Sequence, residues 1–233
     1  MTATRIDHVT VADGTFDLHI WIPESGSGPG ILLIQEIFGV GEYITGVAEK
    51  LATAGYVVGA PDVFWRFAPG WSPGQTPEAL QASMEQVAKL DFPKAIEDCV
   101  AAYEHLTYMD ETGGRAGVLG FCLGGTLAWG VAGATDPDCV VSYYGSGVPS
   151  MIDLVETVTA PTLFHFGSED PFLPFAGIDA LNAAIEGHAN LQINVEIAGH
   201  AFDNFASEMF YNESAANAAW PKTMAFLDAN LKS

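Results

Sequence analysis

The chain has 233 residues, of which 49% are hydrophobic and 16% are charged. This length and composition suit one globular core, so we expect a single domain over residues 1–233. Its 29 acidic residues outnumber 8 lysines and arginines and give a net charge of −21 at pH 7, which excludes nucleic acid and anionic membranes as partners. No window approaches the ~18 uninterrupted apolar residues of a membrane span, and the first residues lack a signal-peptide pattern, so we expect a cytoplasmic protein.

Seven short apolar runs, bounded by Gly, Pro, Asp or Asn, predict strands. Residues 16–22 alternate in polarity, which is typical of a half-exposed strand. The other six runs are more uniformly apolar, which suits strands that are covered on both faces. These six runs span residues 30–35, 56–60, 116–121, 139–144, 161–166 and 191–197.

Helical patterns separate the predicted strands. The clearest one places Phe92, Cys99 and Tyr103 on one helix face, so we expect Cys99 to pack in the core. A closing helix is expected over residues 215–231, and residues 68–76 are rich in turn formers and predict a surface loop. Strands that alternate with helices predict an α/β fold with a mainly parallel sheet of seven to eight strands and helices on both faces. Ligands then bind at the carboxyl ends of the strands.

The three cysteines, Cys99, Cys122 and Cys139, are odd in number and widely spaced. Such spacing favours neither a disulfide framework nor a CxxC metal site. We expect no metal and no cofactor, and we expect a monomer or a weak homo-oligomer. Each thiol has to be interpreted from its own surroundings.

One cysteine lies at the turn after the predicted strand 116–121. Gly120, Cys122 and Gly124 fit the G-x-nucleophile-x-G pattern, in which a sharp strand-to-helix turn lifts the nucleophile above a parallel sheet. An apolar helical run follows, as this turn requires. The alternative is a small buried cysteine in a simple glycine turn, but both flanking elements favour a nucleophile.

A thiol attacks an acyl carbon as the thiolate, so it needs a base and an acid that orients the base. In this architecture the acid and then the histidine follow the nucleophile, each at the carboxyl end of a strand. Asp170 and His200 occupy these positions. Glu169 is an alternative to Asp170, and no spacing of His, Cys or acidic residues favours zinc. The other histidines fit this order less well: His8, His19, His105, His165 and His188.

Five segments carry a family resemblance: QEIFG at 35–39, GFCLGG at 120–125, SYYG at 142–145, GSEDPF at 167–172 and GHAF at 199–202. Together they resemble the dienelactone hydrolases, which are α/β-hydrolases with a cysteine nucleophile. The similarity extends from about Phe16 to the last predicted helix. It implies a catalytic triad of Cys122, Asp170 and His200, which cleaves an ester or lactone bond of a small-molecule substrate through a covalent acyl thioester.

The resemblance also implies a role for Glu36, whose equivalent in this family lies near the thiol and helps to form the thiolate when substrate enters. Burial would make this carboxylate a stronger base, whereas a solvated glutamate at a strand end is the alternative. The oxyanion of the tetrahedral intermediate needs N–H donors. Leu123 follows the nucleophile and supplies one of them, and the resemblance implies the N–H of Ile37 as the other.

The sequence departs from the family at the arginines with which some members bind the carboxylate of a dienelactone. One such arginine follows the catalytic histidine, but residues 201–204 here read AFDN. Arg66 is the arginine nearest to the expected pocket, where it would bind a carboxylate or pack on aromatic rings. We therefore expect neutral esters and lactones to be cleaved at least as well as anionic dienelactones. Four aromatic residues would shape an apolar pocket or pack in the core: Phe38, Trp65, Phe172 and Phe202.

Other functions fit parts of the same pattern. The nearest alternative is a carboxylesterase of broad specificity. A non-catalytic binding module would keep the fold, but its degraded site should lack at least one of Cys122, Asp170 or His200. Thioester or peptide cleavage would use the same three residues, whereas displacement of a halide usually uses a carboxylate nucleophile, which this turn lacks.

Overall fold

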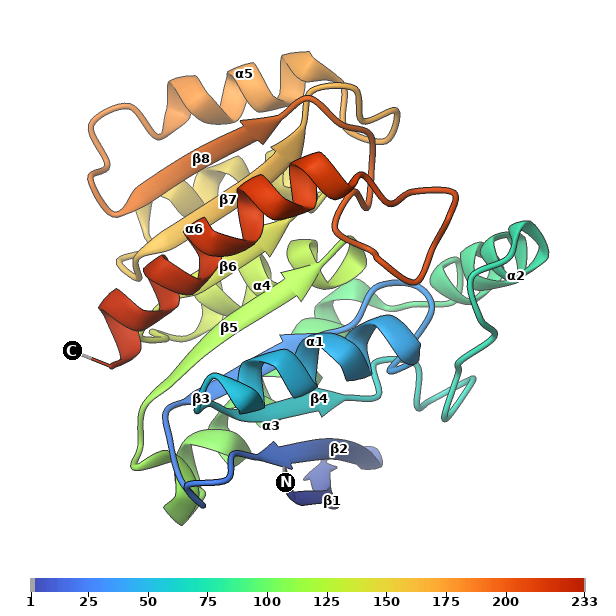
Figure 1. Cartoon of the computed structure of the whole chain (residues 1–233), viewed down its shortest axis with the longest axis vertical. Helices are drawn as coiled ribbons and strands as arrows, with labels where there is room; N and C mark the ends of the chain where they lie inside the picture. The colour runs from blue at the N-terminus through green and yellow to red at the C-terminus, as the bar shows by residue number, and fades with distance from the viewer. Residues whose placement is uncertain (1–2, 233) are drawn as a thin grey trace.

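Eight strands form one sheet in the computed structural model, which describes residues 3–232 (Figure 1). The strand order is β1-β2-β4-β3-β5-β6-β7-β8, and every pair from β4 to β8 is parallel. The strands are β1 (Ala3–Val11), β2 (Gly14–Ile22), β3 (Gly30–Ile34), β4 (Val57–Pro61), β5 (Ala116–Phe121), β6 (Val140–Tyr143), β7 (Thr162–Gly167) and β8 (Leu191–Glu196). Met1, Thr2 and Ser233, which the expected domain includes, lie outside the described residues.

All seven predicted strands are confirmed within one or two residues, and β1 is the eighth. It pairs antiparallel with β2 through a hairpin that turns at Ala12 and Asp13. The sequence did not reveal β1 because most of its side chains are exposed and polar, so it has no apolar run. As an edge strand, β1 is held by β2, which in turn pairs antiparallel with β4.

Helices cover both faces of the sheet, which confirms the expected architecture. The helices α1 (Glu42–Thr53) and α6 (Glu213–Leu231) lie in front of the sheet in Figure 1 and bury their apolar side chains against it. The opposite face is covered by α3 (Phe92–Tyr108), α4 (Leu123–Ala134) and α5 (Phe175–Ala184), with the 3-10 helix η2 (Val148–Glu156). The segments at 68–76 and 215–231 are a loop and a helix, as predicted.

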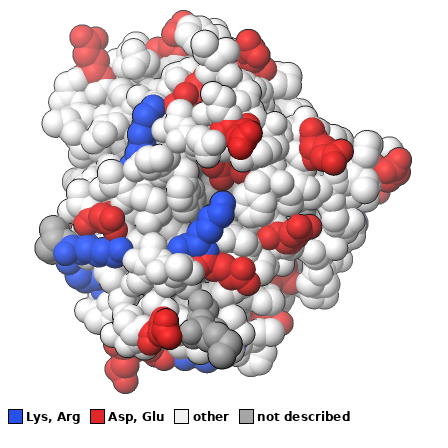
Figure 2. Space-filling view, in the orientation of Figure 1, with Lys and Arg blue, Asp and Glu red and all other residues white. Residues whose placement is uncertain are grey.

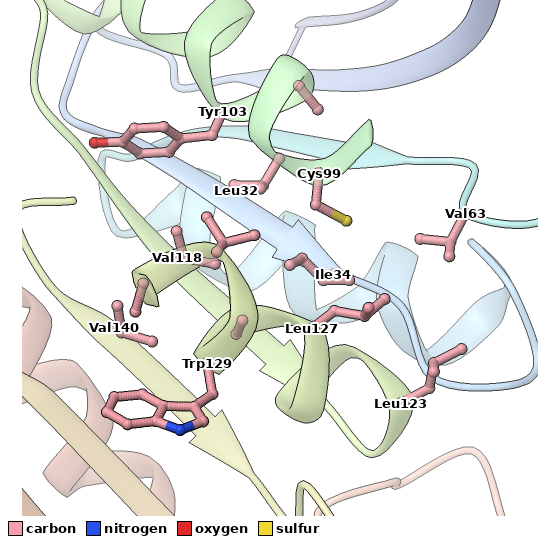
Figure 3. Packing of buried hydrophobic residues seen from close by; sticks show 14 of the residues in the cluster. Leu32, Ile34, Val63, Cys99, Tyr103, Val118, Leu123, Leu127, Trp129 and Val140 are labelled. Atoms are coloured by element: carbon pink, nitrogen blue, oxygen red, sulfur yellow. The ribbon is translucent and has the colours of Figure 1, made fainter. Parts of the chain in front are cut away.

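Cys99 belongs to the core of this second face. Figure 3 shows it on α3, pointing into a cluster that includes Ile34 of β3 and Leu127 of α4. The Cys99 side chain is fully buried, and burial raises the pKa of its thiol far above the usual range. The core role predicted for Cys99 is therefore confirmed.

The turn between β5 and α4 holds its cysteine in a strained conformation. Cys122 has a φ of 56° and a ψ of −113°, in the left-handed half of φ space that non-glycine residues seldom adopt. The flanking glycines are required by close packing. A Cβ on Gly120 would lie 1.9 Å from the carbonyl oxygen of Gly124, and a Cβ on Gly124 would lie 2.2 Å from that of Ile34.

One helix lies outside the two layers. Helix α2 (Pro77–Val87) stands to one side of the sheet in Figure 1, after the loop at 68–76. It buries only a few small or polar side chains, Ala79, Ser83 and Gln86. Its apolar residues Leu80, Met84 and Val87 are only partly covered and line an apolar cavity at the carboxyl edge of the sheet.

The acidic surface is dispersed on the face that Figure 2 shows. Red acidic side chains are scattered over this face rather than collected in one patch, and the blue basic side chains are fewer. Three of the lysines form ion pairs, Lys94 with Asp13, Lys222 with Glu196 and Lys232 with Asp228. Within residues 3–232, no helix has both the length and the apolar character that a transmembrane segment needs.

The glycine turn gives a stability prediction. Gly124→Ala should lower the free energy of unfolding by about 3 kcal/mol, because backbone atoms of β3 cannot move aside for the new methyl group. Gly199→Ala is the matched control, since its Cβ would have no neighbour closer than 4.0 Å and should change stability by less than about 1 kcal/mol. Urea unfolding measures both values, and equal stability of the two variants would contradict the packing described here.

Candidate active site

Three loops at the carboxyl edge of the sheet bring a thiol, an imidazole and a carboxyl group together. Cys122 follows β5, Asp170 follows β7 and His200 follows β8. His200 Nε2 lies 3.0 Å from Cys122 Sγ, and His200 Nδ1 lies 2.7 Å from Asp170 Oδ2. The other carboxylate oxygen of Asp170 accepts a hydrogen bond of 2.8 Å from the Phe172 N–H. The alternative acid, Glu169, is exposed.

Backbone strain is concentrated at this edge. Among residues 3–232, the non-glycine residues with positive φ are Cys122, Tyr144 and Ala201, at 56°, 38° and 53°. Ala201 follows His200 directly, and the Tyr144 ring lies 5.2 Å from the His200 ring. Such conformations persist only where the surroundings impose them, and they are frequent at active sites. Here the three strained residues lie at or next to Cys122 and His200.

The cluster is mostly removed from solvent, while its sulfur stays accessible. Asp170 and His200 are 5% and 8% exposed, and Cys122 is partly exposed at the cavity. Burial disfavours a charged His200 ring, but the neighbouring Cys122 sulfur and the hydrogen bond with Asp170 outweigh burial and raise the pKa of His200. A proton on the His200 ring is therefore stabilised from both sides, by the sulfur at Nε2 and by the carboxylate at Nδ1.

Glu36 is a buried carboxyl group in the same cavity. It is 2% exposed, and its Oε1 accepts hydrogen bonds from Asn204 Nδ2 at 2.7 Å and from Gln75 Nε2 at 3.2 Å. Burial raises the pKa of Glu36 to about 7; the Gln75 hydrogen bond and His200 oppose this effect, and Asp203 adds to it. Glu36 is therefore poised between its neutral and charged forms near neutral pH.

Asp203 is a second buried carboxyl group, close enough to Glu36 to affect its pKa. Asp203 accepts a hydrogen bond of 2.7 Å from the Tyr43 hydroxyl, whose oxygen lies 3.4 Å from that of Tyr144. Burial raises the pKa of Asp203 to about 6, against the Tyr43 hydrogen bond and the charge of Lys50. No local sequence pattern predicts roles for Asp203, Asn204 or Gln75. The polar pair that follows GHAF, at 203 and 204, is the one available signal, and by itself it indicates only that an arginine is absent there.

The two residues expected to supply the oxyanion donors line the same cavity as the sulfur. Leu123 begins α4, and both Leu123 and Ile37 line the cavity with Cys122. The loop that carries Ile37 is held by Gln35, whose amide donates to the Glu36 carbonyl oxygen and accepts from the Val63 N–H. The first amides of α4 also carry the positive end of its dipole, which favours negative charge at this place.

An apolar cavity of about 190 Å³ opens above the sulfur. Helix α2 supplies one wall, and Phe38, Phe172 and Phe210 supply others; the full lining comprises Glu36, Ile37, Phe38, Leu80, Met84, Val87, Phe92, Cys122, Leu123, Thr126, Ser146, Gly147, Phe172, His200, Ala201 and Phe210. Within the described residues, neither lysine nor arginine lines this cavity. Phe38 and Phe172 are thus placed where a substrate would contact them.

Arg66 lies outside this cavity, which corrects the expected binding role. Its guanidinium forms ion pairs with Asp13 and Asp98 and lies 4.3 Å above the Trp65 ring. Two carboxylates therefore neutralise it, and it lines a separate, smaller hollow. Trp65 donates its indole N–H to Asp98 and lies outside the cavity lining as well. Phe202 is fully buried in the core and packs on the Tyr143 and Tyr144 rings.

The fold and the site together define the class of protein. A mainly parallel sheet, a strained nucleophile turn after β5, and an acid and a histidine after later strands are the features of an α/β-hydrolase. The family model described as the dienelactone hydrolase family matches residues 16–231, and the chain belongs to this family. The predicted resemblance and fold class are therefore confirmed.

Relatives along the whole chain support this assignment. The chain is 28% identical to carboxymethylenebutenolidase 1 of Cupriavidus pinatubonensis over 97% of each protein. It is 32% identical to the carboxymethylenebutenolidase of a Pseudomonas species, over 88% of this chain and 87% of the relative. A solved dienelactone hydrolase-like promiscuous phosphotriesterase from metagenomic libraries shares the fold, with a TM-score of 0.82 at 18% identity over 99% of each chain. The protein is accordingly a carboxylic ester hydrolase.

The buried Glu36 carboxyl group gives a pH-dependent stability prediction. In the fold Glu36 keeps its proton up to about pH 7, whereas its ordinary pKa is 4.5. The stability that the protonated Glu36 carboxyl group contributes is complete below pH 4.5 and is lost as the pH rises through 7, where the buried group has to become charged. Glu36→Gln imitates the protonated form. Its free energy of unfolding should therefore exceed that of the wild type by up to about 3 kcal/mol at pH 8.5 and by less than about 1 kcal/mol at pH 5.

Urea unfolding at the two pH values measures this difference. Glu42→Gln is the control, because Glu42 is exposed at the start of α1 and its replacement should leave the pH dependence unchanged. Parallel stability curves for the wild type and Glu36→Gln would show that Glu36 does not titrate as its burial requires.

Proposed function

We propose that the protein hydrolyses neutral, largely apolar esters and lactones, with Cys122 as the nucleophile and an acyl thioester as the intermediate. The observation that carries this proposal is the continuous contact from Cys122 Sγ to His200 Nε2 and from His200 Nδ1 to Asp170, at 3.0 and 2.7 Å. These distances suit proton transfer between a nucleophile, its base and the group that orients the base.

Acylation begins when Sγ attacks the carbonyl carbon of the bound ester. The thiol proton passes to His200 Nε2, and Asp170 stabilises the resulting imidazolium. The carbonyl oxygen becomes an oxyanion, which accepts hydrogen bonds from the N–H groups of Leu123 and Ile37. Each such donor is worth about 3 to 4 kcal/mol in related sites. The intermediate then collapses, the bond to the alkoxide breaks, and His200 returns the proton to the leaving oxygen.

Deacylation repeats these steps with water. Water enters the position that the alcohol has left and gives a proton to His200 Nε2 as its oxygen attacks the thioester carbon. The same N–H groups bind the second oxyanion. When the carbon–sulfur bond breaks, the sulfur leaves with the electron pair and takes the proton from His200. The acid product departs, and the resting pair of thiol and imidazole is restored.

Glu36 assists formation of the thiolate. Its carboxyl group lines the same cavity as Cys122 and titrates near neutral pH, so its charged form can take the thiol proton first. The proton then passes to His200 Nε2, which later gives it to the leaving oxygen. In the structure its oxygen is instead held by Asn204 and Gln75. The carboxylate has to turn from these amides toward the sulfur before it can act. This requirement keeps the empty enzyme from using Glu36 as a base.

The cavity favours a neutral substrate. Its walls are mainly aliphatic and aromatic, and its ionisable carboxyl group, Glu36, would repel an anion. Arg66, which was expected to bind a substrate carboxylate, forms ion pairs with Asp13 and Asp98 instead. A missing charge-assisted contact costs about 1.5 to 3 kcal/mol, which corresponds to roughly ten- to a hundredfold in binding. The net charge of −21 adds to the disadvantage of anions.

Two esters with acyl chains of equal length test this proposal. The kcat/KM for p-nitrophenyl valerate should exceed that for p-nitrophenyl hydrogen glutarate, whose chain ends in a carboxylate, by about tenfold or more. Cys122→Ala should reduce turnover of both esters by at least about 10³-fold. A faster reaction with the glutarate ester would refute the preference for neutral substrates. Undiminished turnover by Cys122→Ala would refute the nucleophile.

A further inference from the structure

Helix α2 is a wall of the cavity with few attachments to the rest of the protein. Leu80, Met84 and Val87 face the cavity from this helix, and Met84 is about half exposed. One side-chain hydrogen bond, from Trp71 Nε1 to Ser83 Oγ at 3.1 Å, ties α2 to the loop that precedes it. A substrate in the cavity would therefore press on an element that lies outside the two helical layers (Figure 1).

The same loop delivers one amide into the site. Gln75 precedes Thr76, which caps α2 by accepting a hydrogen bond from the Ala79 N–H. Gln75 is thus connected to the first turn of α2 by a single residue. Its side chain contacts residues of two other loops, Glu36 after β3 and Asn204 after β8. Gln75 Nε2 donates to Glu36 Oε1 and Gln75 Oε1 accepts from Asn204 Nδ2, both at 3.2 Å.

These contacts connect two parts of one cavity. Glu36 and the apolar face of α2 line the cavity from different elements. Gln75 donates a hydrogen bond to Glu36 and directly precedes Thr76, the N-cap residue of α2. Asn204 is fully buried and holds its place through the Ala206 N–H as well as through Glu36. Of the two amides that hold Glu36, Gln75 is therefore the one that can move together with α2.

We propose that Gln75 is a positioning residue that couples helix α2 to Glu36, so that a substrate which displaces α2 also releases the Glu36 carboxylate for its task at the thiol. The proposal rests on the proposed function, because it assumes that Glu36 serves as a base. In this view the Gln75 amide links the binding of a substrate in the cavity to the formation of the Cys122 thiolate.

Several charged and titratable groups face Glu36, and Gln75 acts alongside them. His200 favours the carboxylate, Asp203 disfavours it, and Tyr43 and Tyr144 lie near enough for their pKa values to respond to its charge. The hydrogen bond from Gln75 favours the carboxylate. When this donor is removed, Glu36 should keep its proton to a higher pH, and the other neighbours should be unaffected.

The pH dependence of kcat/KM with p-nitrophenyl valerate tests the coupling. Gln75→Met keeps the length of the side chain and removes the donor, so the acidic limb of the profile should move up by about one pH unit. Gln75→Glu places a second carboxyl group beside Glu36 and should move the limb further in the same direction. Gln81→Met is the matched control, since Gln81 is exposed on α2, and it should leave the profile in place.

A double variant separates coupling from a structural role. In a Glu36→Gln background, Gln75→Met should cause no shift, because the group through which it acts no longer titrates. A Gln75→Met profile identical to that of Gln81→Met would overturn the proposal, and so would an equal loss of activity at every pH in both backgrounds. If Glu36→Gln alone left the wild-type profile unchanged, the role of Glu36 in the proposed function would fail, which is a different result from failure of the coupling.

Discussion

The contact between the Cys122 sulfur and the His200 ring, at 3.0 Å, is the interaction on which the rest of the site depends. It exists because a strained turn after β5 lifts the sulfur above the sheet and a loop after β8 brings the ring to the same edge. Gly120 and Gly124 let strand and helix approach closely enough for this turn. Leu123, Ile37 and Glu36 line the same cavity as that sulfur.

Much of the fold and the core of the site were predictable because they follow from local patterns. Apolar runs bounded by turn formers marked seven of the strands, and the order of nucleophile, acid and histidine selected Cys122, Asp170 and His200 from many residues of the same types. The edge strand β1 was missed because its side chains are mostly polar and exposed. A strand that is held by a neighbour's backbone needs no apolar run of its own.

The polar network around Glu36 and the true partners of Arg66 were not predictable for a different reason. Asn204 and Gln75 lie 168 and 39 residues from Glu36 in sequence, and Asp13 lies 53 residues from Arg66. Which amide or carboxylate meets which charge depends on how the loops close, and no local pattern records it. As a result, Arg66 is neutralised outside the cavity, and the residue that contacts Glu36 from the loop after β8 is the neutral amide of Asn204. The site therefore combines acid–base chemistry with apolar walls.

The proposed mechanism requires the sulfur of Cys122 to carry the acyl group during turnover. Brief mixing with p-nitrophenyl acetate, acid quenching and peptide mapping by mass spectrometry test this requirement directly. The peptide that contains Cys122 should carry an acetyl group, and those that contain Cys99 or Cys139 should carry none, because these two thiols are buried. An acetyl group that forms and decays at the rate of turnover on any other residue, with Cys122 unmodified, would contradict this mechanism.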